Sequence, residues 1–285
     1  MVYAIRPPLM DSNSHGKNIL DRIVEVRRES IAHRKRVLPD VALKIAAQKV
    51  EPPRDFAGAL SRNGFNVIAE LKKASPSRGV IRAQYDPASL APSLEAAGAA
   101  ALSVLTEEDF FSGSLADLKA ARKGTQVPVL RKDFIIDPWQ VWESRAAGAD
   151  SFLLITSILE DDLLRELLEL GRSLQMEPLV EVHSREEIDR AIAAGARIIG
   201  VNNRDLRNFD VRLGTSFDLV EAIPEDCIAV SESGLRTHDD LVRLRSAGFD
   251  AFLIGEHLMK ETDPCVPLRE LMGPVGAGRM SGTGA

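Results

Sequence analysis

Short apolar runs recur along the chain and alternate with amphipathic stretches. Eight runs rich in Val, Ile and Leu start roughly 20 to 35 residues apart. Parallel strands that are buried on both faces and covered by helices give this pattern. The chain is therefore predicted to repeat one strand–helix unit eight times. The predicted strands are residues 66–72, 101–106, 128–134, 151–156, 177–182, 198–203, 228–233 and 251–256.

The stretches between these runs are predicted to be helices, for example residues 87–97 and 160–174. Four of the helices end in similar phrases, EAAGAA, RAAGAD, AAAGAR and RSAGFD. Each phrase puts a glycine after a helix and before a strand, where the chain often needs a left-handed conformation that a Cβ disfavours. The repeat therefore supports one strand–helix unit. Its glycines are Gly98, Gly148, Gly195 and Gly248.

Eight such units favour an α/β fold closed into a (β/α)8 TIM barrel. A doubly wound open sheet is the alternative, but its first strand is usually followed by a GxGxxG turn, and here that strand ends in KKASPSRG. Ahead of it, residues 18–36 and 55–61 predict two helices joined by a charged, Pro-containing connection. We expect an N-terminal helical extension at 1–65, the barrel at 66–272 and a disordered, Gly-rich tail at 273–285.

Length and composition change this picture little. A chain of 285 residues suits one barrel with short extensions. With 45% hydrophobic residues, 27% charged residues and a formal charge of -6, it is typical of a soluble globular protein, and its acidic balance opposes nucleic acid as a main partner. No apolar run reaches the ~18 residues of a membrane span, and the start lacks a signal-peptide pattern. We expect a cytoplasmic protein with no membrane partner.

The two cysteines, Cys227 and Cys265, have neither the number nor the spacing of a disulfide framework or a zinc site. We expect two reduced, structural thiols. No His-x-x-x-His pair suggests a metal, and no nucleotide-binding turn suggests a cofactor.

Polar residues gather where the predicted strands end, which is where barrels of this kind place their active sites. Side chains alternate along a strand, so Glu70 and Lys72 share one direction, toward the barrel mouth. Any one such residue is explained by a strand meeting solvent. Several charged residues on one rim are harder to explain, because burying a charge near the core is unfavourable unless it has a partner or a ligand. We therefore predict that they form a catalytic cluster. Its members are Glu70, Lys72, Lys132, Glu181, Asn202 and Glu232.

The turns after the last two strands predict a phosphate site. Ser233 and Gly234 follow the seventh strand, and Gly255 and Glu256 follow the eighth, ahead of a short helix at 256–260. Small residues let backbone N–H groups approach an anion, and a helix N-terminus favours negative charge. Glycine also serves ordinary turns, but its position after these two strands favours phosphate.

Three other residues receive structural interpretations. His183 follows Glu181, but strand alternation puts it in the next loop, so we expect a surface histidine. Trp139 and Trp142, three positions apart on a predicted helix, are expected to pack rather than to form a stacking platform.

The strand-end motifs, taken in order, resemble those of the indole-3-glycerol-phosphate synthase family over about residues 19–272. They read AELKKASPSRG, SVLTEEDFFSGS, VLRKDFIID, PLVEVHS, GVNNRDL, VSESGL and AFLIGEHLM. The resemblance implies a cofactor-independent TIM-barrel carboxy-lyase of tryptophan biosynthesis. It would convert 1-(2-carboxyphenylamino)-1-deoxyribulose 5-phosphate into indole-3-glycerol phosphate, carbon dioxide and water.

The same resemblance assigns residue roles. Lys132 would be the general acid and Glu181 the catalytic carboxylate, with the other rim residues completing the polar cluster. Arg204 lies in the matching NNRDL segment. Some members carry Ser in place of Glu256, a change that a backbone N–H contact would survive. Phosphate would be held at Ser75, Ser233, Gly234 and Gly255, and the apolar walls would be Phe111 and Phe134.

Two alternatives stay open at this point. A Schiff-base aldolase on the same fold would also use a strand-end lysine with neighbouring acids. A non-catalytic sugar-phosphate-binding barrel would not need paired lysines and carboxylates. The sequence leaves open the oligomeric state, monomer included, and which of Lys72 and Lys132 acts in the loss of water.

Overall fold

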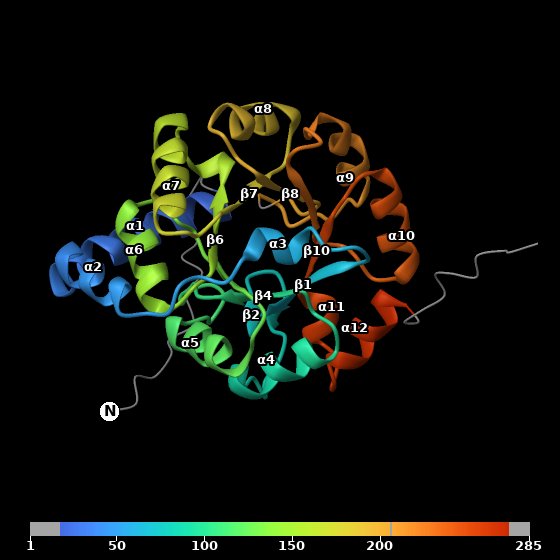
Figure 1. Cartoon of the computed structure of the whole chain (residues 1–285), viewed down its shortest axis with the longest axis horizontal. Helices are drawn as coiled ribbons and strands as arrows, with labels where there is room; N and C mark the ends of the chain where they lie inside the picture. The colour runs from blue at the N-terminus through green and yellow to red at the C-terminus, as the bar shows by residue number, and fades with distance from the viewer. Residues whose placement is uncertain (1–17, 206, 274–285) are drawn as a thin grey trace, which may run out of the picture.

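Eight parallel strands close into a barrel that is ringed by helices (Figure 1). The computed structural model describes residues 18–205 and 207–273. Around the barrel the strand order is β1-β10-β9-β8-β7-β6-β5-β4, and every neighbouring pair is parallel. The (β/α)8 prediction is thus confirmed, with one strand in each apolar run. The strands are β1 (Asn66–Leu71), β4 (Ala101–Leu105), β5 (Val129–Lys132), β6 (Ser151–Ile155), β7 (Leu179–Val182), β8 (Ile198–Asn202), β9 (Ile228–Glu232) and β10 (Ala251–Ile254).

Helices follow the strands and cover the outside of the barrel (Figure 1). Side-chain caps begin several of them; the Thr237 hydroxyl, for example, accepts the N–H of Asp240. Gly148 and Gly248 end two helices in the left-handed conformation, with φ of 88° and 117°, as the glycine repeat predicts. The helices are α4 (Pro87–Ala96), α5 (Leu115–Gly124), α6 (Pro138–Ala147), α7 (Asp161–Ser173), α8 (Arg185–Ala193), α9 (Gly214–Leu219), α10 (His238–Ala247), α11 (Glu256–Met259) and α12 (Cys265–Met272), with 3-10 turns at Thr156–Ile158 and Val220–Ala222.

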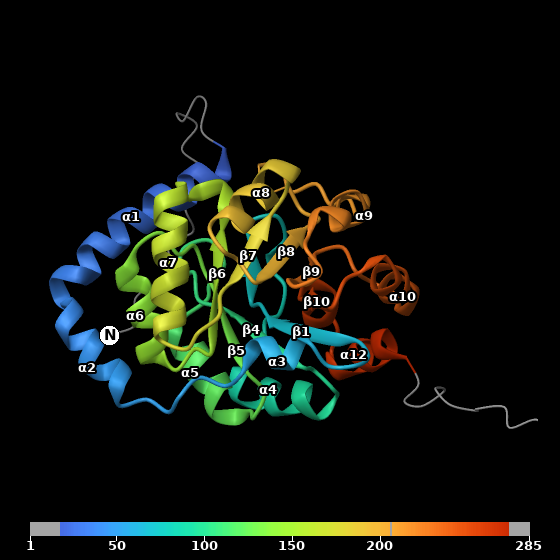
Figure 2. The same ribbon diagram turned by 45° about the horizontal axis from the view of Figure 1, so that its top comes forward.

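Three helices precede the barrel: α1 (Ile19–Val37), α2 (Asp40–Gln48) and α3 (Phe56–Leu60). The predictions for α1 and α3 are confirmed, and the charged, Pro-containing connection between them also forms a helix, which was not predicted. The connection contains α2, which lies beside α6 (Figure 2). Leu43 of α2 is buried in one cluster with Trp139 of α6. A short helix is stabilised mainly by such packing, which local sequence does not reveal.

The α1 helix is tied to the barrel by buried charges. Asp133, just after β5, pairs with Arg27 of α1 and, at 2.9 Å, with Arg131 of β5. The Thr106 hydroxyl also donates to Asp133, at 2.5 Å. Burial raises the pKa of Asp133, but the two guanidinium groups outweigh burial and hold it at about 2. The extension is therefore joined to the strand that carries Lys132.

Apolar side chains fill two layers, one between strands and helices and one inside the barrel. The interior layer ends at α3, whose Phe56 and Leu60 pack beneath the barrel, while Nδ2 of Asn66 donates to the Leu60 carbonyl at 2.7 Å. The strand starts are thus closed, which leaves their carboxyl ends for ligands.

Both cysteines are free thiols, as predicted. In the described part of the chain no helix has the length and apolarity needed to cross a membrane. The tail predicted to be disordered at 273–285 lies outside the described residues, apart from Gly273.

Candidate active site

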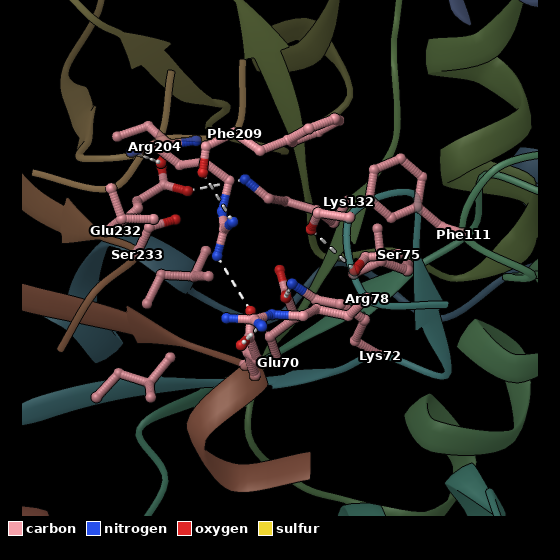
Figure 3. A pocket seen from close by; sticks show the side chains of 18 of the residues that line it. Glu70, Lys72, Ser75, Arg78, Phe111, Lys132, Arg204, Phe209, Glu232 and Ser233 are labelled. Carbon is pink, nitrogen blue, oxygen red and sulfur yellow. Dashed lines mark hydrogen bonds and ion pairs between the residues drawn. The ribbon is translucent and has the colours of Figure 1, made fainter. Parts of the chain in front are cut away.

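A cavity of about 680 Å³ opens at the carboxyl ends of the barrel strands (Figure 3). Each of the eight barrel strands contributes at least one residue to the lining. The structure brings all the predicted site residues together here. They are Glu70, Lys72, Ser75, Phe111, Lys132, Phe134, Glu181, Asn202, Arg204, Glu232, Ser233, Gly234, Gly255 and Glu256.

Lys132, the last residue of β5, lies between two carboxylates. Its Nζ donates to Oε2 of Glu181 and to Oε2 of Glu232, each at 2.8 Å. Burial disfavours the ammonium, but the two carboxylates outweigh burial and raise the pKa of Lys132 well above its ordinary value. The site therefore holds a charged, oriented proton donor.

The two carboxylates are buried to a similar degree but titrate differently. Burial raises the pKa of Glu232 to about 7. The ammonium of Lys132 lowers this pKa, but the like charge of Glu181 raises it again. Burial also raises the pKa of Glu181. The charges of Lys132 and His183 and a hydrogen bond from the Asn202 amide outweigh burial, so the pKa of Glu181 is lowered overall. Two acids whose environments separate their pKa values can take different roles. Glu181 is the better candidate for a base at neutral pH.

A second ion pair lies on β1. Nζ of Lys72 is 2.5 Å from Oε1 of Glu70, which is buried, and both side chains line the cavity. The alternation of strand side chains predicted this common direction. The pair puts a second ammonium on the rim.

The predicted anion end combines tight turns with positive charge. Ser233 and Gly234 have φ of 68° and 84°, so the backbone after β9 is left-handed. Nε of Arg78 and Nη2 of Arg204 are each 3.1 Å from an oxygen of Glu256, the first residue of α11 (Figure 3). These two guanidinium groups line the cavity together with the turns predicted to hold phosphate.

A small hairpin after β1, formed by β2 (Ala74–Ser75) and β3 (Gly79–Val80), lines the cavity and was not predicted. It carries Ser75, whose Oγ is 3.5 Å from that of Ser77, and it supplies Arg78. The basic side chains that the sequence analysis missed are Arg78, Arg236 and Lys260.

The wall away from these basic groups is apolar. The rings of Phe111 and Phe134 have their centroids 6.1 Å apart. Buried Glu107 fixes the first of them, since its Oε2 accepts the N–H groups of Phe110 and Phe111 at 2.7 and 3.0 Å. An aromatic group would fit this wall.

The cavity thus joins an aromatic wall, a lysine between carboxylates and a basic end. The family model described as indole-3-glycerol phosphate synthase matches residues 20–271 of the chain. Proteins of that name from Chloroherpeton thalassium and Carboxydothermus hydrogenoformans are 50% and 46% identical over 244 and 261 residues. These alignments cover 84% and 89% of this chain, and 94% and 99% of those proteins.

The chain belongs to the indole-3-glycerol phosphate synthase family.

Solved structures outside this family share the fold. 3-Hexulose-6-phosphate synthase from Salmonella typhimurium matches with a TM-score of 0.58 and 11% identity, over 73% of this chain and 97% of that chain. A mutant tryptophan synthase alpha-subunit from Pyrococcus furiosus gives 0.57 and 14%, over 73% and 98%. At these identities the likeness shows the barrel alone.

The expectation for the two tryptophans is confirmed, whereas the expectation for His183 is not. The tryptophans pack as predicted: Trp139 is buried, and Trp142 packs against its cluster. The expectation of a surface histidine at His183 is wrong. Its side chain is only 19% exposed, and its Nε2 is 3.5 Å from Oε1 of Glu181. The loop after β7 places the imidazole against Glu181 and Glu187, which strand alternation cannot predict.

Proposed function

We propose that the chain is an active indole-3-glycerol-phosphate synthase, a carboxy-lyase of tryptophan biosynthesis. The observation that carries the proposal is the ammonium of Lys132, held by Glu181 and Glu232 between an aromatic wall and a basic, glycine-lined end. The substrate, 1-(2-carboxyphenylamino)-1-deoxyribulose 5-phosphate, has an aromatic acid at one end, a phosphate at the other and a ketone between them.

The two ends of the cavity would fix the substrate. The carboxyphenyl ring packs against Phe111 and Phe134, and the phosphate accepts backbone N–H groups after β9 and β10 with help from nearby arginines. The ketone then faces Lys132. Holding both ends brings the ring carbon and the ketone carbon into contact, which supplies much of the rate enhancement in ring closures.

Ring closure forms a bond from the aromatic carbon that bears the carboxylate to the ketone carbon. The carbonyl electron pair moves to the ketone oxygen, and Lys132 donates a proton to that oxygen. The bond to the carboxylate then breaks, carbon dioxide leaves, and its electron pair restores the aromatic ring.

Loss of water completes the indole. A hydroxyl leaves the carbon that was the ketone, and a proton leaves the neighbouring carbon beside nitrogen. Glu181 accepts that proton, and an ammonium, Lys72 or Lys132, protonates the leaving hydroxyl. Glu70 and Asn202 orient these groups through the contacts described above.

The direct test is to incubate the purified protein with this substrate and to follow indole absorbance or fluorescence. We expect product formation that requires the phosphate, so an analogue without phosphate is the control. No indole from a folded protein would refute the proposal.

Lys132 is poorly suited to the rival Schiff-base chemistry. An amine must lose its proton to attack a carbonyl, and two carboxylates at 2.8 Å oppose that loss. Borohydride added during turnover should leave the protein mass unchanged. A stable adduct on Lys132 would favour the aldolase.

We also propose a cytoplasmic enzyme whose partner is this small phosphorylated molecule. Both cysteines are free thiols, which fits a reducing compartment. The thiol count of the protein as isolated from its cells, measured with a thiol reagent under denaturing conditions, tests the compartment.

A further inference from the structure

Glu181 and Glu232 hold the same ammonium but differ on their other side. Each accepts a hydrogen bond from Lys132 through Oε2 at 2.8 Å. Oε1 of Glu181 lies 3.5 Å from Nε2 of His183, an ion-pair contact without a hydrogen bond. Among residues 18–205 and 207–273, Oε1 of Glu232 likewise has no hydrogen-bond partner, and the ion pair of Glu232 is with Lys132. The imidazole is therefore placed to favour one carboxylate over the other.

Glu187 of α8 holds the imidazole in this place. Its Oε2 accepts the backbone N–H of His183 at 2.7 Å and lies 3.4 Å from Nδ1. The two ring nitrogens thus face two carboxylates, and only the imidazolium carries a proton on both. The side chains of His183 and Glu187 are 19% and 17% exposed, so solvent screens this contact less than it screens a surface pair.

Two further carboxylates act on His183 in the same direction, Glu232 of β9 and Asp205 in the loop after β8. Each is itself paired with a cation, Glu232 with Lys132 at 2.8 Å and Asp205 with Arg207 at 2.7 Å. Burial lowers the pKa of His183, but the surrounding carboxylates outweigh burial and raise it above its ordinary value. This arrangement favours the charged form of the imidazole next to Glu181.

On the basis of the proposed function, we propose that His183, held by Glu187, is a positioning residue that keeps Glu181 ionised and so selects it over Glu232 as the base. Lys132 alone cannot make this choice, because it contacts both carboxylates at the same distance. The imidazolium breaks that symmetry through Oε1 of Glu181.

A purely structural role for His183 and Glu187 would give a different experimental result. The N–H of Glu187 bonds to Oγ of Ser184 at 3.3 Å, and its carboxylate returns to the N–H of His183, so the motif also caps α8. If capping were its whole role, loss of the imidazole would lower thermal stability and reduce kcat equally at all pH values.

The experiment compares pH profiles of kcat for the parent, His183→Gln and Glu187→Gln. Glutamine keeps a polar side chain but cannot become positive, so the pKa of Glu181 rises. We expect the acid limb of the His183→Gln profile to move up by about one pH unit, since an opposite charge at this distance shifts a carboxyl pKa by one unit or more. That shift is about a tenfold loss of kcat at pH values on the acid limb, below the pKa of Glu181, with little loss at neutral pH and above and little change in KM.

Glu187→Gln should move the acid limb in the same direction by less, because the imidazole stays but holds its proton less firmly. Its matched control is Glu186→Gln. Glu186 is the neighbouring residue of α8, is exposed, and loses the same charge. We expect the control profile to overlay that of the parent.

A readout independent of turnover separates this inference from the proposed function. Carboxyl 13C NMR of the ligand-free protein follows the titration of Glu181, assigned by the signal that is missing in Glu181→Gln. An upward shift of that titration in His183→Gln or Glu187→Gln supports the inference, even if the parent makes no indole and the proposed function fails. An unchanged Glu181 titration, with a kcat loss that is equal at all pH values, would overturn it.

Discussion

Gly255 makes room for Glu70: a Cβ at position 255 would lie 2.2 Å from Oε1 of Glu70. The φ of Gly255 is -122°, which other residues adopt readily, so the glycine is required by contact and not by backbone strain. From the sequence alone, Gly255 has only a place in the predicted phosphate cradle. The structure adds a second role, because Gly255 leaves room for the carboxylate of Glu70, which pairs with Lys72.

We expect Gly255→Ala to lower kcat by roughly 10- to 100-fold, because small displacements of catalytic groups carry penalties of that size. Gly234→Ala should act on binding instead. Its φ is 84°, and the new Cβ would meet Val211 at 2.7 Å, which disturbs the turn at the anion end. Steady-state kinetics of both variants gives the comparison. A pure KM effect for Gly255→Ala would restrict Gly255 to the cradle.

Lys132→Met should reduce kcat by more than about 100-fold, since general acid catalysis typically contributes ~10² to 10⁴. Methionine keeps much of the length but cannot donate a proton. Lys119→Met, an exposed lysine of α5, is the matched control and should keep parental kcat. Near-normal turnover by folded Lys132→Met would remove this residue from the acid role.

Arg78 and Arg204 both pair with Glu256 at 3.1 Å, so in the proposed function Glu256 would compete with the substrate phosphate for these positive charges. We expect Glu256→Gln to lower KM by about fivefold at low salt, the equivalent of ~1 kcal/mol for one like-charge contact near the surface. The difference should shrink as salt screens it. Glu169→Gln, which removes an exposed carboxylate of α7, is the control. A higher KM for Glu256→Gln would mean that Glu256 mainly orients the arginines.

The strand residues of the site were predictable because backbone geometry fixes their direction. Alternation alone sent Glu70, Lys72 and Glu181 to one rim, and the structure agrees. His183 and Arg78 lie beyond the strand ends, where loop conformation decides direction and no sequence period reports it. The missed α2 helix has the same cause, since tertiary packing stabilises it.

The buried carboxyl of Glu232 predicts a pH-dependent stability. Its pKa is about 7 in the folded protein against an ordinary 4.5, so the folded state binds a proton more tightly than the unfolded state. Stability from this group is present below about pH 4.5 and is lost as the pH rises through 7. Glutamine does not ionise, so Glu232→Gln should gain melting temperature relative to the parent between pH 5 and pH 8. Scanning calorimetry at the two pH values measures this, and a parallel pH dependence would contradict the shifted pKa.

The charges that join α1 to the barrel should dominate the acid stability of the protein. Asp133 is fully buried between Arg27 and Arg131, and its folded pKa of about 2 lies below an ordinary 3.8. Its stabilising effect is therefore present above pH 3.8 and is lost as the pH falls toward 2. At neutral pH, Asp133→Asn leaves the buried guanidinium of Arg27 without its carboxylate, which typically costs about 3 to 5 kcal/mol, while Arg131 keeps Glu143 at 2.9 Å.

A double-mutant cycle identifies the contact responsible. Arg27→Met removes the α1 partner, and methionine fills much of the same volume. If Arg27 and Asp133 interact as the structure indicates, Asp133→Asn costs less free energy of unfolding when Arg27 is already methionine. Urea unfolding followed by circular dichroism measures each corner of the cycle. Additive losses would mean that Asp133 acts through Arg131 and Thr106 alone. A coupled loss would show that α1 stabilises the strand that ends at Lys132, so that the extension supports the site from outside the barrel.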